Sequence, residues 1–312
     1  MQTILGANGA IGKELAKELK RHYTSDIRLV SRQPERVNDT DTLWAADLLD
    51  AHQTDEAIKG SDIVYFTVGL PINGMLWEKQ FPQMMRHVLN ACERYHAKLV
   101  FFDNTYMYPA QKELLTEKTP FIPIGQKAKA RATMTSLVLD AIASEKIEAV
   151  ICRAPEFYGP LSTPSFTNSL IINPIFNGRT AKVLISDQTL RTLIWAPDAS
   201  RATALIGNTP EAYRQTWHLP CDDNRLTTQK FIELMGELYG NKFDYKIVSE
   251  IELIAQSAEK PHIKELLELL PRYHYDYLFD SSKFKRQFPE FRVTSYQEGI
   301  QKISDEAKIV IR

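Results

Sequence analysis

The sequence predicts an α/β fold, in which a parallel β-sheet carries helices on both faces and a smaller C-terminal lobe follows. The first half alternates short apolar runs of strand length with amphipathic segments of helix length. The strand-type runs are almost continuously apolar, which is typical of parallel strands buried on both faces. After Pro155, prolines and polar loops become frequent. Because crossovers between parallel strands are right-handed, this order indicates a doubly wound, Rossmann-type sheet.

Each predicted strand is a short apolar run that ends at a glycine or a polar residue. In chain order the predicted strands are Gln2–Leu5, Asp26–Ser31, Leu43–Ala46, Asp62–Val68, Lys98–Asp103 and Glu148–Ala154.

The first predicted helix is amphipathic, with Ile11, Leu15 and Leu19 on one face and lysines on the other. The same periodicity predicts the helices of the first half, which are Ile11–His22, Thr54–Lys59, Trp77–Tyr95 and Lys127–Ser144. In the second half it predicts Thr227–Tyr239, Glu250–Leu270 and Tyr296–Ala307. The aromatic run Arg272–Tyr277 favours a half-buried strand over a ligand wall.

Composition excludes several classes of function. The chain has 312 residues and a formal net charge of -1, so no global field favours nucleic acid or an anionic membrane. No apolar run reaches the ~18 residues of a membrane span, and the N-terminus starts as a strand rather than a signal peptide. The isolated Cys92, Cys152 and Cys221 form no metal-binding pattern. We therefore expect a soluble, cytoplasmic protein without a metal site.

The turn between the first strand and the first helix has the spacing of a phosphate-binding loop. Gly6 suits a sharp turn, Gly9 leaves the backbone open, and Gly12 allows the helix to pack against the sheet. Free N–H groups and the helix dipole attract a pyrophosphate at such a terminus. The residues predicted to bind the cofactor here are Gly6, Asn8, Gly9, Ala10, Ile11 and Gly12.

The end of the second strand predicts the cofactor. An acidic residue here would bind the ribose 2′-hydroxyl and repel a 2′-phosphate. The sequence has Ser31 and Arg32 instead, which can hydrogen-bond and pair with that phosphate. We therefore expect NADP rather than NAD. Residues 1–155 are then the NAD(P)-binding core, and residues 156–312 form mainly a substrate-binding lobe, with some segments returning to the core.

With these motifs in order, the chain resembles the extended short-chain dehydrogenase/reductase family, in its NAD-dependent epimerase/dehydratase group. The resemblance implies that Asp47 and Leu48 contact adenine and that Val68 and Gly69 line the cofactor. The later motifs that carry it are Arg153–Pro160, Arg191–Ala199 and Asp280–Lys283. It also implies a homodimer through the two central helices, Trp77–Tyr95 and Lys127–Ser144.

The chain departs from this family at the residue that transfers a proton. The family uses a tyrosine followed four residues later by a lysine, so that both lie on one helix face. If Lys129 is matched to the family's lysine, Gly125 stands at the tyrosine position. If Lys127 is matched instead, Pro123 stands there. No tyrosine occurs between Tyr108 and Tyr158. The resemblance therefore supports cofactor binding better than it supports the usual chemistry.

Other side chains at the carboxyl ends of the strands are candidates for the missing role. Asn104 and Thr105 lie near the family's serine or threonine position, and Tyr106 or Tyr158 is a substitute acid. The residues predicted to contact the substrate are Tyr108, Glu156 and Arg191.

Two functions follow from these residues. The first is an NAD(P)-dependent oxidoreductase or epimerase-like enzyme, which transfers hydride to or from a small carbonyl, alcohol or sugar-type substrate. The alternative is a non-catalytic NADP sensor of the same fold, favoured by the glycine at the tyrosine position.

Overall fold

A computed structural model describes residues 1–310 of the chain. These residues form two compact units, and each contains segments that are distant in the sequence. Unit 1 consists of Met1–Met107, Pro123–Ala154 and Ala199–Leu219. Unit 2 consists of Tyr108–Ile122, Pro155–Asp198 and the chain from Pro220.

Unit 1 is built on a seven-stranded sheet with the order β11-β6-β5-β4-β1-β2-β3. All neighbouring strands in it run parallel. The order reverses next to β1, which confirms the predicted doubly wound α/β fold. The strands are β1 (Gln2–Leu5), β2 (Ile27–Ser31), β3 (Thr42–Ala45), β4 (Ile63–Phe66), β5 (Lys98–Asp103), β6 (Ala149–Arg153) and β11 (Thr216–His218). The sequence did not predict β11, which pairs with β6 over only three residues.

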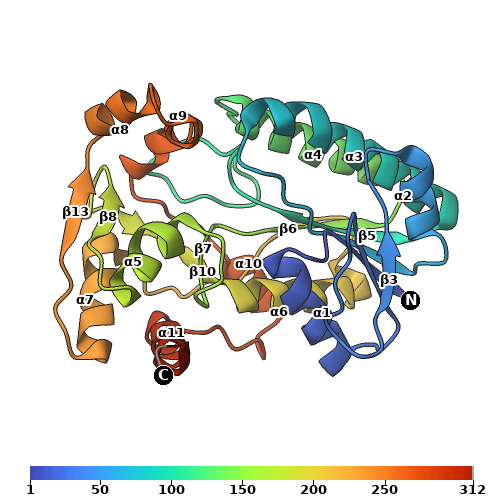
Figure 1. The fold of residues 1–312 in the computed structure, drawn as a ribbon. Helices are drawn as coiled ribbons and strands as arrows, with labels where there is room; N and C mark the ends of the chain where they lie inside the picture. Colours follow the sequence, from blue (N-terminus) through green and yellow to red (C-terminus); the bar gives the residue numbers. More distant parts are fainter. Residues whose placement is uncertain (311–312) are drawn as a thin grey trace. The chain divides into compact units, whose positions relative to one another are not determined.

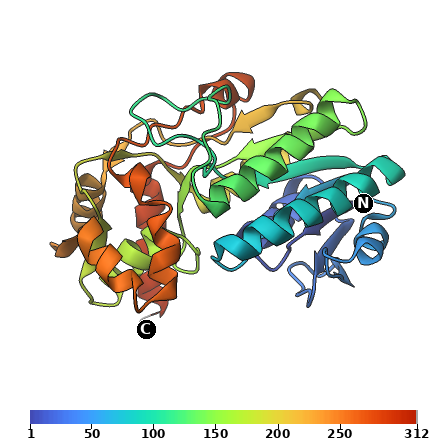
Figure 2. The same ribbon diagram turned by 90° about the horizontal axis from the view of Figure 1, so that it is seen from above.

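Helices cover both faces of this sheet. Figure 1 shows α2 (Ala51–Ile58), α3 (Gly74–Tyr95) and α4 (Gln126–Ala143) on one face, and α1 (Ala10–His22) and α6 (Ala196–Gly207) on the other. Figures 1 and 2 both show α3 and α4 side by side. The apolar faces of α2, α3 and α4 pack on the sheet and form the largest part of the core.

Two helices of unit 1 begin one turn earlier than predicted, because polar side chains cap them. Asp50 accepts hydrogen bonds from the N–H groups of His52 and Gln53, which starts α2 at Ala51. Asn73 accepts from the N–H of Leu76 at 3.0 Å, which starts α3 at Gly74. The apolar periodicity marks where a helix packs, whereas the cap marks where it begins.

Unit 2 contains three two-stranded sheets and several short helices. β7 (Glu156–Tyr158) pairs with β10 (Leu193–Trp195), β8 (Ala181–Leu184) with β13 (Tyr245–Val248), and β9 (Leu190–Arg191) with β12 (Leu226–Thr227). A π-helix, Asn168–Ile172, leads into α5 (Asn173–Phe176). The remaining helices are α7 (Thr228–Tyr239), α8 (Glu250–Ser257), α9 (Pro261–Leu267), α10 (Ser282–Gln287) and α11 (Tyr296–Val310).

Two predicted elements of unit 2 were wrong. The single helix Glu250–Leu270 is divided into α8 and α9, because Pro261 forces Lys260 out of the helical region (φ -121°, ψ 97°). The strand predicted over Arg272–Tyr277 is a 3₁₀ turn, Leu270–Tyr273, followed by one bridge between Tyr277 and Arg191. The alternating aromatic residues of this segment therefore do not form a pleated strand.

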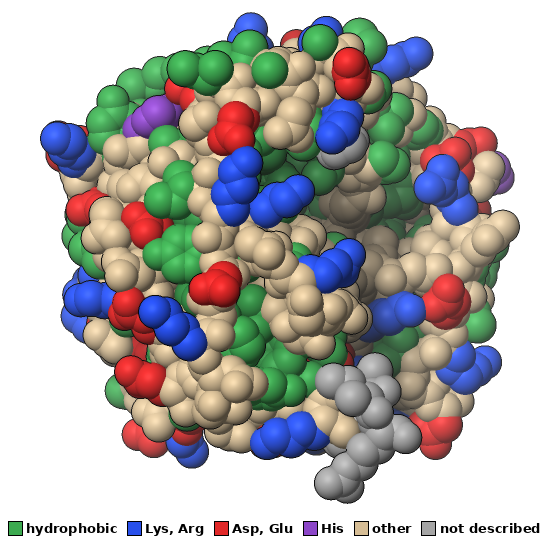
Figure 3. Space-filling model, turned by 60° about the vertical axis from the view of Figure 1, so that its left-hand side comes forward, with side chains coloured by type: hydrophobic (Ala, Val, Ile, Leu, Met, Phe, Trp, Pro, Cys, Tyr) green, Lys and Arg blue, Asp and Glu red, His purple; other side chains and the backbone are tan. Residues whose placement is uncertain are grey.

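The surface mixes charges of both signs, and Figure 3 shows basic and acidic side chains interspersed over one face. Among residues 1–310, no helix combines the length and apolarity that crossing a bilayer requires. Within the same part of the chain, no group of three or more His, Cys, Asp or Glu side chains is arranged to hold a metal ion.

Candidate functional site

The glycine turn of unit 1 places backbone where side chains would collide. Gly6 has a φ of +83°, and a Cβ on it would lie 2.7 Å from the Cα of Val68. A Cβ on Gly12 would lie 2.9 Å from the Cα of Ala7. The first and third glycines therefore hold the start of α1 close to the ends of β1 and β4.

Gly9 differs from its two neighbours in the motif, since the space around it is open. It is exposed and forms the N-cap of α1 with an ordinary φ of -69°. A Cβ here would meet only the carbonyl of Gly6, at 3.4 Å, among the described residues. Within that part of the chain no side chain caps the helix start, and Ala10 and Ile11 are partly exposed. This terminus offers backbone donors to a diphosphate.

Asn8 connects the glycine turn to the loop that follows β2. Its side-chain N–H donates to the carbonyl of Gln33 at 2.7 Å, and its Oδ1 accepts from the N–H of Glu35 at 3.1 Å. The Glu35 carboxylate pairs with Lys13 at 2.6 Å. Arg32 extends from the same loop and is exposed.

The remaining cofactor candidates of unit 1 surround this turn. Ser31 ends β2, and its hydroxyl accepts from the N–H of Gln33 at 3.2 Å. The Asp47 carboxylate accepts from the N–H of Leu49 at 3.0 Å, while Leu48 packs in the core. Gly69 is exposed, and no atom of residues 1–310 comes within 4 Å of the place where a Cβ would lie.

A buried ionic cluster lies at the carboxyl end of β5. Asp103 accepts two hydrogen bonds from Arg131 through one oxygen, at 3.0 and 2.7 Å. Its other oxygen accepts from Thr135 at 2.9 Å and from Arg153 at 3.1 Å. All four side chains are buried, so the cluster ties α4 and β6 to β5. The sequence did not predict it, because its members come from three separate elements.

The cluster orients α4 and separates its two candidate lysines. Lys127 lies one turn before Arg131 on the same buried face and is 1% exposed. Lys129 lies on the exposed face. The structure therefore does not support the sequence-based preference for Lys129, since only Lys127 shares the face directed to the end of β5. Gly125 is the N-cap of α4, with a φ of +88°.

The polar residues after β5 have different surroundings. The Asn104 side chain accepts from the N–H of Tyr106 at 3.0 Å, and Thr105 is buried. Tyr106 is partly exposed, and its ring stacks on Trp77 with centroids 5.9 Å apart and planes 9° apart. Tyr108 belongs to unit 2, where it is buried against Phe121.

Tyr158 lies in the core of unit 2. Its ring contacts Trp195, Phe231 and Tyr296. Its hydroxyl donates to the carbonyl of Ser295 at 3.3 Å, and burial raises its pKa well above the usual range. A phenol held in this way cannot reach a substrate, so the placement does not support the predicted acid role.

Arg191 and Glu156, two predicted substrate contacts, bind each other. A guanidinium N–H donates to the Glu156 carboxylate at 2.9 Å, and another donates to the carbonyl of Arg272 at 2.9 Å. The guanidinium also lies over the rings of Tyr273 and Tyr277, 4.4 and 5.0 Å from their centroids. Burial opposes the charge, but Glu156 and the rings outweigh it and raise the Arg191 pKa.

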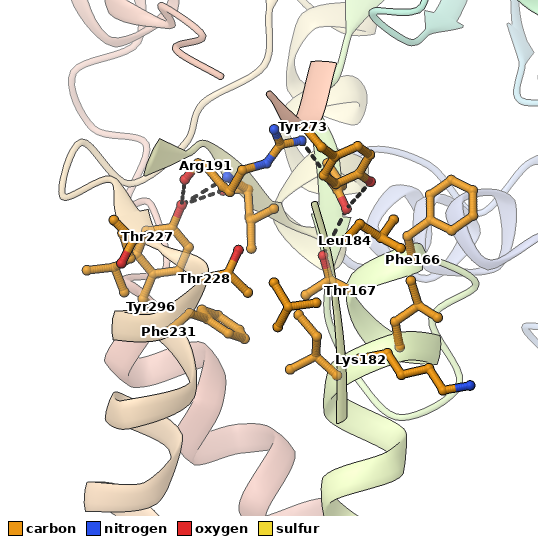
Figure 4. A pocket seen from close by; sticks show the side chains of 16 residues that line it. Phe166, Thr167, Lys182, Leu184, Arg191, Thr227, Thr228, Phe231, Tyr273 and Tyr296 are labelled. Carbon is orange, nitrogen blue, oxygen red and sulfur yellow. Dashed lines mark hydrogen bonds and ion pairs between the residues drawn. The ribbon is translucent and has the colours of Figure 1, made fainter. Parts of the chain in front are cut away.

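A pocket lies beside this ion pair, entirely within unit 2, and its empty space, part of which is open to solvent, amounts to about 510 Å³. Figure 4 shows its walls: Tyr296, Phe231 and Thr227 on one side, and Thr167, Leu184 and Phe166 on the other. The sequence did not predict this pocket. Its lining includes residues of β8, β10, α7 and the π-helix, and no local sequence pattern relates these elements.

The chain matches a known family over most of its length. A family model described as the NAD dependent epimerase/dehydratase family matches residues 3–218. No curated protein matches the sequence.

Solved structures match the whole chain at low identity. The UDP-glucuronic acid 4-epimerase of Bacillus cereus, in complex with NAD, is 15% identical with a TM-score of 0.79, and the match covers 100% of both chains. The UDP-glucose 4-epimerase of Thermus thermophilus, also with NAD, is 17% identical with a TM-score of 0.78, over 99% of both chains. A double mutant of the dTDP-glucose 4,6-dehydratase DesIV from Streptomyces venezuelae, with NAD bound, is 14% identical with a TM-score of 0.79, over 99% of this chain and 97% of that one. At these identities the likeness shows the fold.

Proposed function

The chain belongs to the NAD dependent epimerase/dehydratase family, and on that premise we propose that it is an NADP-dependent oxidoreductase or epimerase-like enzyme. It acts on a small carbonyl, alcohol or sugar-type substrate, and the bound nicotinamide supplies or accepts the hydride. The observation that carries this proposal is the open helix start at Gly9, where backbone N–H groups stand free of side chains among the described residues. The solved structures named above, which are 14–17% identical to this chain, contain NAD.

The preference for NADP is supported by the loop after β2. Ser31 and Arg32 provide a hydroxyl and a cation where an acidic residue would select NAD. A nearby carboxylate, Glu35, is paired with Lys13. Asn8 holds this loop against the glycine turn through two hydrogen bonds. We therefore assign Arg32 to the 2′-phosphate and Asn8 to positioning the loop.

We assign the contact with the nicotinamide ribose to Lys127. Arg131, one turn later on the same face, contacts Asp103 at the end of β5. Lys127 therefore lies on the buried helix face that contacts the end of β5, whereas Lys129 lies on the exposed face. Tyr106 is a partly exposed phenol of unit 1 beside this strand end, and we assign it the proton transfer. Asn104 and Thr105 are the polar groups next to it.

A matched pair of lysine variants tests this site. Lys127→Met should weaken NADPH binding at least tenfold by calorimetry, because it removes the charge on the buried face. Lys129→Met should leave the affinity within about twofold. Equal effects of the two variants would contradict the assignment of the ribose contact.

The chemistry is tested by following NADPH absorbance at 340 nm across a panel of aldehydes, ketones and nucleotide sugars. Turnover that is lost in Tyr106→Phe and kept in Tyr158→Phe would identify the acid, since the second variant changes a phenol buried in unit 2. Turnover kept in Tyr106→Phe would refute the role of Tyr106.

The cofactor preference has its own test. Arg32→Ala should weaken NADPH binding about tenfold and leave NADH binding unchanged, because one charge pair with phosphate is lost. Arg36→Ala is the control, since that guanidinium already donates to the carbonyls of Asp39 and Asp41. If wild type bound NADH more tightly than NADPH, the assignment to NADP would be wrong.

A non-catalytic NADP sensor is the second candidate. The observation in its favour is the start of α4, where Gly125 is the N-cap and no tyrosine occurs in the first turn. Tight NADPH binding without turnover on any substrate, together with a cofactor-dependent change of oligomeric state, would select it. A homodimer through α3 and α4 is part of both proposals, and light scattering measures it directly.

A further inference from the structure

We propose that the pocket of unit 2 binds an uncharged, largely apolar group, with the Thr228 hydroxyl as its hydrogen-bond partner, and not the diphosphate of a nucleotide. This substrate class deepens the proposed function and rests on it. Three features of the pocket support it: the mainly apolar walls, the ion pair between Arg191 and Glu156, and the Thr228 hydroxyl, which makes no hydrogen bond within residues 1–310.

The walls of the pocket are mainly aliphatic and aromatic. They come from β8, the π-helix, β10 and α7, so a ligand would contact carbon on several sides (Figure 4). The apolar residues that line it are Phe166, Leu170, Ile171, Val183, Leu184, Leu193, Leu226 and Phe231. A surface of this kind stabilises a bound apolar group in proportion to the area removed from water.

Two of the three charged residues of the wall, Arg191 and Glu156, neutralise each other. One oxygen of Glu156 accepts from Arg191 at 2.9 Å, and the other accepts from Thr167 at 3.1 Å and Tyr273 at 3.3 Å. Arg191 is also held by the carbonyl of Arg272 and by two aromatic rings. A phosphate that took Arg191 would leave the partly buried Glu156 carboxylate without its cation, which is costly.

The polar groups that remain are few. The Thr227 hydroxyl caps α7 by accepting from the N–H of Lys230, and the Tyr296 hydroxyl accepts from the N–H of Leu193 at 2.9 Å. The Lys182 ammonium points away from the other labelled side chains in Figure 4. Thr228 lines the pocket, and its hydroxyl makes no hydrogen bond within residues 1–310. The Thr228 hydroxyl, which can both donate and accept, therefore lines a mainly apolar space, and this suits a carbonyl or hydroxyl on a hydrocarbon ligand.

The experiment uses the full chain and the neutral fluorophore N-phenyl-1-naphthylamine. We expect its fluorescence to rise on binding and to fall when uncharged cyclohexanone or benzyl alcohol displaces it. UDP and UDP-glucose should not displace it at millimolar concentration. Displacement by UDP, or no fluorophore binding, would overturn the proposal.

Matched variants locate the signal in the pocket. Leu170→Trp, which fills the space, should lower fluorophore affinity at least tenfold, whereas Leu139→Trp on the exposed face of α4 should not. Thr228→Val should weaken benzyl alcohol about fivefold and leave the fluorophore unchanged, since only one hydrogen bond is lost. Thr180→Val, an exposed threonine outside this pocket, is its control. Equal effects in test and control variants would refute the location.

NADPH binding, measured on the same variants, separates this inference from the proposed function. It should be unchanged in Leu170→Trp and Thr228→Val, because the cofactor residues belong to unit 1 and these two belong to unit 2. If wild type failed to bind NADPH while the fluorophore result held, the proposed function would fail and the apolar pocket would stand. If NADPH bound and UDP displaced the fluorophore, the reverse would hold.

Discussion

The three glycines of the turn after β1 do not all have the same physical role. Gly6 and Gly12 are required for packing, since a Cβ on either would collide with backbone. Gly9 is not required for packing, because a Cβ would fit there. Three glycines of one motif therefore have two different physical roles, and substitution can separate them.

Gly9→Val should abolish measurable NADPH binding while changing the melting temperature by less than about 2 °C, because the added carbons occupy the space over the first-turn N–H groups. Gly12→Ala is the contrasting variant, and it should lower the melting temperature, because its Cβ meets Ala7 at 2.9 Å. Calorimetry and thermal scans measure both effects. Unchanged NADPH affinity in Gly9→Val would contradict the assignment of this turn.

Asp103 is the residue on which the buried cluster depends. Asp103→Asn should destabilise the protein by about 3 kcal/mol in urea unfolding, since Arg131 and Arg153 would remain buried without a carboxylate. The control is Glu14→Gln, whose ion pair with Lys17 lies at the surface and should matter much less. Comparable losses in the two variants would show that the Asp103 cluster is not a stabilising centre.

At the scale of elements, local polar groups decide where helices begin and end. Asp50 starts α2, Asn73 starts α3, and Pro261 separates α8 from α9. The periodicity of apolar residues predicted that each helix exists, because burial of one face selects that period. The positions of the helix ends could not be predicted in this way, because they depend on which side chain hydrogen-bonds to the backbone.

The cap of α2 predicts a pH dependence. Hydrogen bonds from the N–H groups of Gln53 and His52 lower the Asp50 pKa below its usual 3.8. A lowered carboxyl pKa stabilises the fold above the unfolded value and loses that contribution as pH falls through the folded value. Asp50→Ala should therefore lower the melting temperature most near pH 6–7, and the difference should shrink below about pH 3.8. A difference from wild type that is constant with pH would exclude an ionised cap. Asp50→Asn and Asp50→Ala should differ from each other by an amount that does not change with pH, because neither side chain titrates there.

At the scale of the whole molecule, the two compact units carry different chemistry. Unit 1 contains the glycine turn, the loop after β2 and the Asp103 cluster, while unit 2 contains the apolar pocket and the Arg191–Glu156 pair. Neither unit is a continuous stretch of chain. A ligand of one unit should stabilise the folded state that binds it.

NADPH at 100 times its dissociation constant should stabilise the state that binds it by about 2.7 kcal/mol. Differential scanning calorimetry should show this as an upward shift of several degrees in the unfolding transition. The Gly9→Val variant is the control and should show no shift. A shift of equal size in that variant would mean that NADPH binds elsewhere.

The sequence by itself determined the parallel α/β core, because the length and period of apolar runs depend only on which faces are buried. It also determined the glycine turn, since Gly6, Gly9 and Gly12 act within seven consecutive residues. Only the tertiary structure decided that Lys127 rather than Lys129 faces inward, that Tyr158 is a core residue, and that Arg191 is paired with Glu156. The tertiary structure was also needed to find β11, the Asp103 cluster and the unit 2 pocket. Each of them joins segments that are far apart in the chain, and such contacts produce no local sequence pattern.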